Sequence, residues 1–385
     1  MRNPEPLAFH AGLRRRLRKA ASEMQRKLQS KELAGRSFLD ERLPASLPEF
    51  HMPAAVQELL ERLKRGELPS AGYNAPFTTP TPQPAREPPP VPPGARFLSA
   101  QFANDAGARP YKLFVPSGYR GNPVPLIVML HGCAQSPDDF AAGTGMNTLA
   151  DRQTFLVAYP GQISAANPSK CWNWFDAGEQ QRGRGEPSII AGITRKVMAD
   201  YTVDPRRIYV AGMSAGGAQA AIMAATYPDL YAAIGVHSGL AFGSASDIAS
   251  AFTAMRQGGG RGPRAEGLSG VPARDIVPAI VFHGDRDSTV HCVNGDEIIA
   301  QAASVRPLTL RVEDGRAPGG HAYHRTLHVD PLGDTVLEQW VVHGAGHAWS
   351  GGSAAGSFTD PRGPDASREM VRFFMAHHLP VEAPQ

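Results

Sequence analysis

Residues 208–217 read Ile-Tyr-Val-Ala-Gly-Met-Ser-Ala-Gly-Gly, with Gly212-Met213-Ser214-Ala215-Gly216 at the centre. This G-x-S-x-G run follows an apolar stretch and precedes residues 217–226, whose composition favours a helix. A serine between glycines on a tight strand-to-helix turn is typical of a nucleophile elbow, because a side chain at either flank would collide with neighbouring chain. The stretch therefore predicts a strand–turn–helix unit that presents Ser214 as a nucleophile.

Short apolar runs recur on both sides of this turn and alternate with helical patterns. The runs predict strands at residues 111–116, 126–130, 155–160, 208–211, 232–236, 279–282 and 335–342. The helical patterns cover residues 188–201, 218–227, 247–256 and 366–378. Strands that alternate with helices imply right-handed crossovers and a mainly parallel sheet. Together with the serine turn, this order predicts an α/β-hydrolase fold over residues 95–380, with a central sheet flanked by helices.

A serine hydroxyl needs a histidine base, and that base needs an acid to orient it. In α/β-hydrolases the order along the chain is serine, acid, histidine. The predicted strand at 279–282 runs into a loop that holds both Asp285 and Asp287. We favour Asp287, which lies further past the strand end, whereas Asp285 beside the turn glycine is better placed to hold the loop by backbone hydrogen bonds.

The histidine candidates lie in the glycine-rich segment after the last predicted strand. His347 is favoured because such a loop suits a base that must project over the sheet. His343 is the rival, at the strand end, where we expect it to face the core or solvent. The oxyanion hole needs two backbone amides. We assign them to Ala215, after the nucleophile, and to Cys133, in the loop after residues 126–130.

Three further histidines, His321, His324 and His328, have a spacing that could suit metal ligands. No cysteine or acidic cluster accompanies them, so we interpret them as ordinary surface or loop histidines. The predicted chemistry requires no metal and no organic cofactor.

Five motifs occur in order and together resemble the poly(3-hydroxybutyrate) depolymerase family of esterases, which includes feruloyl and acetylxylan esterase relatives. They are LHGCAQ (130–135), CWNWFD (171–176), GMSAGG (212–217), HGDRDSTV (283–290) and GHAWSGG (346–352). The resemblance covers roughly residues 97–380 and implies an α/β-hydrolase that cleaves carboxylic esters. It places the triad on Ser214, Asp287 and His347, and the oxyanion amides on Cys133 and Ala215.

Two further expectations concern residues in these motifs. The resemblance makes a Cys133–Cys171 disulfide a hypothesis, with Cys292 unpaired. The large rings of Trp172, Trp174 and Trp349 are candidates for binding an apolar polymer or an aromatic acyl group. The alternative is that these tryptophans are core residues.

The N-terminal part of the chain differs in composition from the rest. Residues 1–75 form a basic, partly helical extension, and residues 76–94 form a proline-rich linker. An apolar stripe at Leu13, Leu17, Ala20, Met24 and Leu28 is surrounded by arginine and lysine. This pattern is typical of a basic amphipathic helix that docks on an anionic or apolar surface, and we hypothesise that it holds the chain near a polymer granule. The alternative is a solvated helix that packs on the main domain or merely fluctuates.

Composition bears on whether the chain binds nucleic acid, crosses a membrane or is secreted. The chain has 385 residues and a formal net charge of +3, so global charge gives no case for binding nucleic acid. Three cysteines do not suggest a secreted disulfide framework. No apolar run of about 18 residues occurs, so we expect no transmembrane segment. Residues 1–10 lack the apolar stretch of a secretory signal, which predicts a cytoplasmic location, with export by a non-cleaved route left open.

The leading hypothesis is hydrolysis of polyhydroxyalkanoate, such as poly(3-hydroxybutyrate), or of its oligomers through an acyl-enzyme on Ser214. A feruloyl or acetylxylan esterase is the alternative within enzymes. A granule-binding scaffold without turnover is an alternative of another class, and the candidate triad argues against it.

Overall fold

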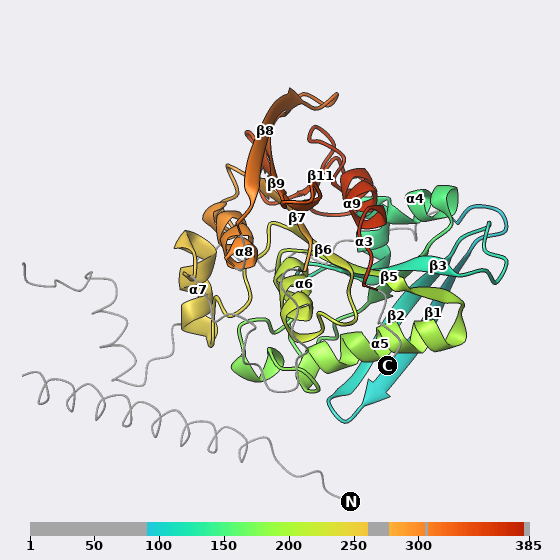
Figure 1. Ribbon diagram of the computed structural model, residues 1–385. Coiled ribbons are helices and arrows are strands. Elements are labelled where there is room, and N and C mark those ends of the chain that lie inside the picture. The colour runs from blue at the N-terminus through green and yellow to red at the C-terminus, as the bar shows by residue number, and fades with distance from the viewer. Residues whose placement is uncertain (1–90, 261–276, 305–306, 381–385) are drawn as a thin grey trace, which may run out of the picture. The chain divides into compact units, whose positions relative to one another are not determined.

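The computed structural model describes residues 91–260, 277–304 and 307–380 (Figure 1). The predicted basic extension at 1–75 lies outside the described residues, and so does the linker up to residue 90. In the described part, helices flank one large sheet, as the α/β-hydrolase prediction requires.

Ten strands form this sheet in the order β1-β2-β4-β3-β5-β6-β7-β10-β9-β8. Their bounds are β1 (Arg96–Asn104), β2 (Gly107–Val115), β3 (Val124–Leu130), β4 (Leu156–Pro160), β5 (Val203–Met213), β6 (Ala233–His237), β7 (Ala279–Gly284), β8 (Thr309–Arg316), β9 (Ala322–Val329) and β10 (Thr335–Val342). The six strands from β4 to β10 in this order are mutually parallel. The outer strands β1, β2, β8 and β9 join them antiparallel. The prediction of a mainly parallel sheet is confirmed for the centre.

Seven α-helices lie in the described ranges. They are α3 (Pro137–Thr144), α4 (Met146–Gln153), α5 (Gly185–Asp200), α6 (Ala215–Thr226), α7 (Ile248–Gln257), α8 (Val293–Ala303) and α9 (Ala366–Met375). A 3-10 turn η1 (Ala177–Glu179) and a short pair of strands, β11 (Trp349–Ser350) and β12 (Thr359–Asp360), complete the described elements. None of the helices in these ranges is long and apolar enough to cross a membrane.

The sheet has a separate core on each face, and strand β3 contributes to both. Its residues Leu126 and Val128 pack with apolar residues of α5, α6 and α8. The alternate residues Ile127 and Met129 pack with α3, α4 and α9. Every residue of β3 is buried, as expected of a central parallel strand, and a fully buried aliphatic side chain contributes about 1.5–3 kcal/mol. This double core fixes the strand ends from which the candidate site is built.

Candidate active site

Ser214 occupies the sharp turn between β5 and α6. Its backbone has φ 56° and ψ −122°, a conformation that L-residues rarely adopt and that is held where the surrounding structure imposes it. The Ser214 amide donates to the carbonyl of His237, 2.9 Å away at the end of β6. A Cβ on Gly212 would collide with the Gly216 backbone, and one on Gly216 would collide with the Leu130 carbonyl. Both flanking glycines are therefore needed for the turn, as the sequence pattern predicts.

Asp287 and His347 are joined by a hydrogen bond. The distance from Nδ1 of His347 to Oδ2 of Asp287 is 2.7 Å. The other carboxylate oxygen of Asp287 accepts from the amides of Thr289 and Val290, at 2.9 and 2.8 Å. The Asp287 side chain is fully buried, and that of His347 is 13% exposed. Three donors thus hold one buried carboxylate in a single orientation.

The environment of Asp287 keeps its carboxylate ionised. Burial by itself would raise the pKa of Asp287, but the hydrogen bond and charge of His347 and the Val290 amide outweigh burial and lower that pKa. An ionised Asp287 accepts a hydrogen bond from the Nδ1–H group of His347. The imidazole then keeps its Nε2 lone pair, which is the form that a general base needs.

The loops that carry these two residues are fastened together. Strands β7 and β10 are parallel neighbours, so both loops leave the same edge of the sheet. The Arg286 amide donates to the Ala345 carbonyl at 3.0 Å. A Cβ on Gly284 would collide with that same carbonyl, so this close approach requires glycine. Side chains 60 positions apart in sequence are thereby brought into contact.

The rival residues Asp285 and His343 form a second pair. Nδ1 of His343 lies 2.9 Å from Oδ2 of Asp285, and the Gly344 amide donates to Oδ1 of Asp285 at 2.7 Å. The two side chains are 34% and 48% exposed. Asp285 therefore makes the backbone hydrogen bond expected of it, and His343 lies in contact with solvent.

The loop after β3 lies beside the serine. A Cβ on Gly132 would be 3.5 Å from the Ser214 Cβ. Within the described ranges, the amides of Cys133 and Ala215 have no hydrogen-bond acceptor. Two amides without acceptors, one in this loop and one directly after Ser214, are what an oxyanion hole requires.

The three tryptophans do not take the substrate-facing positions predicted for them. Trp172, Trp174 and Trp349 are only 0%, 6% and 1% exposed. The indole of Trp172 donates to the His131 carbonyl, and that of Trp349 donates to the Ser367 hydroxyl. These rings are core residues, the alternative to the substrate-binding prediction, because packing and buried hydrogen bonds hold them there.

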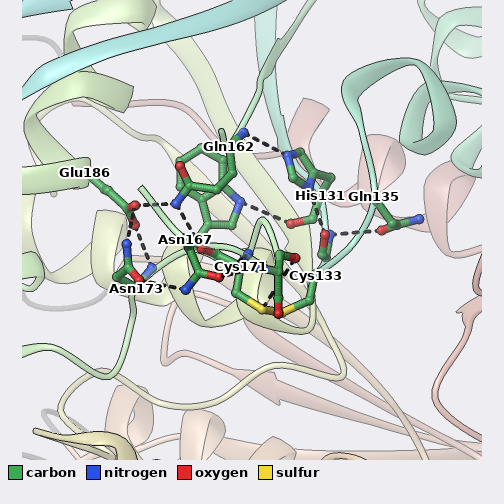
Figure 2. The surroundings of a disulfide bond; sticks show 11 residues. His131, Cys133, Gln135, Gln162, Asn167, Cys171, Asn173 and Glu186 are labelled. Atoms are coloured by element: carbon green, nitrogen blue, oxygen red, sulfur yellow. Dashed lines mark hydrogen bonds between the residues drawn. A yellow bond between two sulfur atoms is a disulfide. The ribbon is translucent and has the colours of Figure 1, made fainter. Parts of the chain in front are cut away.

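Cys133 and Cys171 form a disulfide, which confirms the hypothesis drawn from the family resemblance (Figure 2). The bridge joins the loop after β3 to the segment before η1, across a sequence separation of 38. Cys292 is the free cysteine of the described residues and is half-buried. Disulfides persist mainly in oxidising compartments, so the bridge runs against the expected cytoplasmic location, which stays a prediction.

The histidines interpreted as surface or loop residues need a correction. His324 and His328 lie on strand β9, and His328 is buried because β9 runs between β8 and β10. His321 and His324 each contact an aspartate, Asp360 and Asp314 respectively. Among the described residues no group of three metal-binding side chains is present.

Sequence reasoning gave no role to three buried histidines near the site. His237 stacks between Phe282 and Trp349, and burial lowers its pKa to about 3. His283 lies 3.6 Å from Asp287 and donates from Nε2 to the Val290 carbonyl. His131 follows β3 directly, and burial lowers its pKa to about 4. Each lies at the end of a parallel strand or directly after it. This position in the sequence is the signal that could have identified them as residues near the site.

Residues 109–316 match the family model described as Esterase PHB depolymerase. Poly(3-hydroxyalkanoate) depolymerase C of Paucimonas lemoignei is 34% identical over 257 residues, which cover 64% of this chain and 60% of that protein. Feruloyl esterase B of Neurospora crassa is 35% identical over 158 residues, covering 40% and 53%. This chain thus spans less than two thirds of either relative.

The solved structure of acetyl xylan esterase from Aspergillus awamori superposes with a TM-score of 0.57 at 21% identity. The superposition covers 73% of this chain and 99% of that one. At this level of identity the similarity shows a shared fold.

Proposed function

Since the chain belongs to the esterase PHB depolymerase family, we propose that it hydrolyses carboxylic ester bonds with Ser214 as nucleophile. The observation that carries the proposal is the hydrogen bond of 2.7 Å between buried Asp287 and His347, at the sheet edge where β5 presents Ser214. Parallel sheets of this kind bind ligands at the carboxyl ends of their strands.

In the proposed reaction, Nε2 of His347 takes the hydroxyl proton while Oγ of Ser214 attacks the ester carbonyl. The carbonyl oxygen becomes an oxyanion that accepts hydrogen bonds from the amides of Cys133 and Ala215. The proton then passes from His347 to the leaving alkoxide, so that an alcohol departs and an acyl-enzyme remains. Water, deprotonated by His347, attacks the acyl group; the proton then passes from His347 to Oγ of Ser214 as the bond to the acyl group breaks and the acid leaves.

The substrate we propose is a polyhydroxyalkanoate, such as poly(3-hydroxybutyrate), or its oligomers. The family description and the depolymerase of Paucimonas lemoignei support this choice. The similarity to feruloyl esterase B and to an acetylxylan esterase of Coprinopsis cinerea supports a second candidate, a carboxylesterase acting on feruloyl or acetyl esters of plant polymers.

The proposal is tested by release of 3-hydroxybutyrate from amorphous poly(3-hydroxybutyrate) granules, with S214A as the matched control. We expect release by the natural chain and none by S214A. A parallel assay uses p-nitrophenyl butyrate, methyl ferulate and acetylated xylan. Ser214-dependent cleavage of these esters without granule hydrolysis would support the esterase activity and favour the second candidate as the substrate. Equal rates for both proteins on every ester would refute the proposal.

We also propose that the basic segment of residues 1–75 holds the enzyme on a granule or another anionic surface. Its support is the run of basic residues around the apolar stripe of the sequence. The full chain carrying R14E, R15E and R16E should sediment less with granules while keeping its rate on p-nitrophenyl butyrate. Unchanged sedimentation would contradict this surface role.

A further inference from the structure

The peptide between Gly132 and Cys133 is held in one orientation by the ring of His131. Nδ1 of His131 lies 2.8 Å from the Gly132 carbonyl oxygen. Nε2 of the same ring accepts from the Gln162 amide at 3.0 Å, so the proton is on Nδ1, which donates. In a trans peptide the carbonyl and the next amide point in opposite directions. The Cys133 amide therefore points away from the His131 ring.

Gln162, the residue that fixes the His131 ring, is itself fixed by charged side chains. Its Oε1 accepts from Nε of Arg109 at 2.7 Å, and its Nε2 donates to Glu186 and to the Cys171 carbonyl. Arg109, Gln162 and Glu186 are 6%, 5% and 2% exposed. A polar group buried to this extent has a defined position only when its partners do.

Glu186 also holds the other side of the oxyanion loop. Its carboxylate accepts from the backbone amide of Asn173 at 2.7 Å and from the Asn173 side chain at 2.9 Å. The preceding residue, Trp172, donates to the His131 carbonyl, and Cys171 is bridged to Cys133. Figure 2 shows Glu186 at the left of this group, His131 at the right and the disulfide below.

We propose that Glu186 is a positioning residue for the oxyanion hole. It clamps Gln162 and the segment from Cys171 to Asn173, and through them it fixes the direction of the Cys133 amide. The inference rests on the proposed esterase function. It assigns a role to a carboxylate in α5 that touches neither Ser214 nor any member of the Asp287–His347 pair.

The decisive variant is E186Q, which keeps the shape of the side chain. A glutamine at 186 replaces one acceptor oxygen by an NH2 group. That group must face either the backbone amide of Asn173 or the side-chain donors of Arg109, Gln162 and Asn173, so one side of the clamp is lost. Loss of one oxyanion donor costs about 100- to 1,000-fold in kcat, so a misdirected one should cost about tenfold or more. KM for p-nitrophenyl butyrate should change little, because the ester carbonyl of the bound substrate accepts a weaker hydrogen bond from the Cys133 amide than the oxyanion does.

Two further readouts separate positioning from general damage. A trifluoromethyl ketone adds to Ser214 and forms an oxyanion, so its affinity should fall by the same factor as kcat. The acid limb of the pH profile of kcat/KM reports the free histidine base and should not move. The exchange variant Q162E/E186Q restores one carboxylate and one amide beside Arg109 and should recover part of the lost kcat.

The matched control is E338Q, because Glu338 is also a buried carboxylate paired with arginines, on strand β10. E338Q should lower the free energy of unfolding, and it should not lower kcat and ketone affinity together. Should E186Q fail to fold, N173A removes one donor to Glu186 at a half-buried position and must show the same parallel fall. A folded E186Q with unchanged kcat and ketone affinity overturns the inference. A natural chain no more active than S214A refutes the proposed function instead.

Discussion

Two aspartate–histidine pairs lie next to each other where β7 and β10 end. Asp287–His347 and Asp285–His343 come from the same two loops, and their hydrogen bonds measure 2.7 and 2.9 Å. In the first pair the aspartate is fully buried and the histidine is 13% exposed. In the second the side chains are 34% and 48% exposed. A short hydrogen bond therefore does not distinguish the two pairs, whereas burial does.

Burial matters because it changes what the carboxylate can do. Water competes for an exposed pair and screens its charges, so such pairs contribute about 0–1 kcal/mol. A buried carboxylate with three donors cannot reorient, and it stabilises the imidazolium that forms during catalysis. The same residue types thus form a candidate catalytic pair in one place and a hydrogen bond that joins two loops in the other.

The largest expected effect separates the two histidines. H347A should lower kcat on p-nitrophenyl butyrate at least about 10,000-fold, because no base then accepts the Ser214 proton. H343A should leave kcat within about threefold, since its ring faces solvent. Steady-state kinetics of both variants measure this. A large loss in H343A with a small loss in H347A would reverse the assignment.

Substitution of the two aspartates should affect kcat in the same unequal way, with a somewhat smaller difference than for the two histidines. D287N offers an amide where His347 needs an acceptor, and kcat should fall about 1,000- to 10,000-fold. D285N can still accept from the Gly344 amide, so kcat should stay within about threefold. Comparable losses in both variants would show that the exposed pair also takes part.

Acid should destabilise the folded protein through the two buried histidines beside the site, His237 and His131. Burial lowers the pKa of His237 to about 3 and that of His131 to about 4, whereas an unfolded histidine has its ordinary pKa of 6.5. As pH falls below 6.5 the unfolded chain therefore binds protons that the folded chain does not. Stability is lost progressively from there down to the folded pKa, by about 2 kcal/mol for each histidine at about pH 5.

Urea unfolding at neutral and mildly acid pH measures this loss. H237F should remove about 2 kcal/mol of the pH-dependent part, whatever it does to stability at neutral pH. An unaltered pH dependence in H237F would mean that folding does not lower the pKa of His237.

The smallest expected effect is the stability contributed by the exposed pair. A double-mutant cycle on Asp285 and His343 should give a coupling of about 0.5 kcal/mol that decreases at high salt. Unfolding free energies of D285N, H343A and the double variant supply it. A coupling of several kcal/mol that does not decrease with salt would show that the difference in burial does not explain the difference between the two pairs.

Much of the fold could be predicted because its signals are local. Central strands such as β3 are buried on both faces and appear as continuous apolar runs. The outer strands β1, β8 and β9 were not predicted, since they lack such runs. β8 has almost every residue exposed, and its sequence carries arginine, glutamate and aspartate. Pairing with β9 makes it a strand, and no local pattern records that pairing.

The sequence by itself determined the serine turn and the order of the candidate triad. Steric limits at Gly212 and Gly216 act within a few residues, and the chain order of Ser214, Asp287 and His347 needs no coordinates. Only the tertiary structure decided which aspartate is buried beside His347, that Trp172 and Trp349 lie in the core, and that Glu186 contacts Gln162 and Asn173. The physical reason is that burial and hydrogen bonding join residues far apart in the chain, and they exist only once the strands and loops have packed.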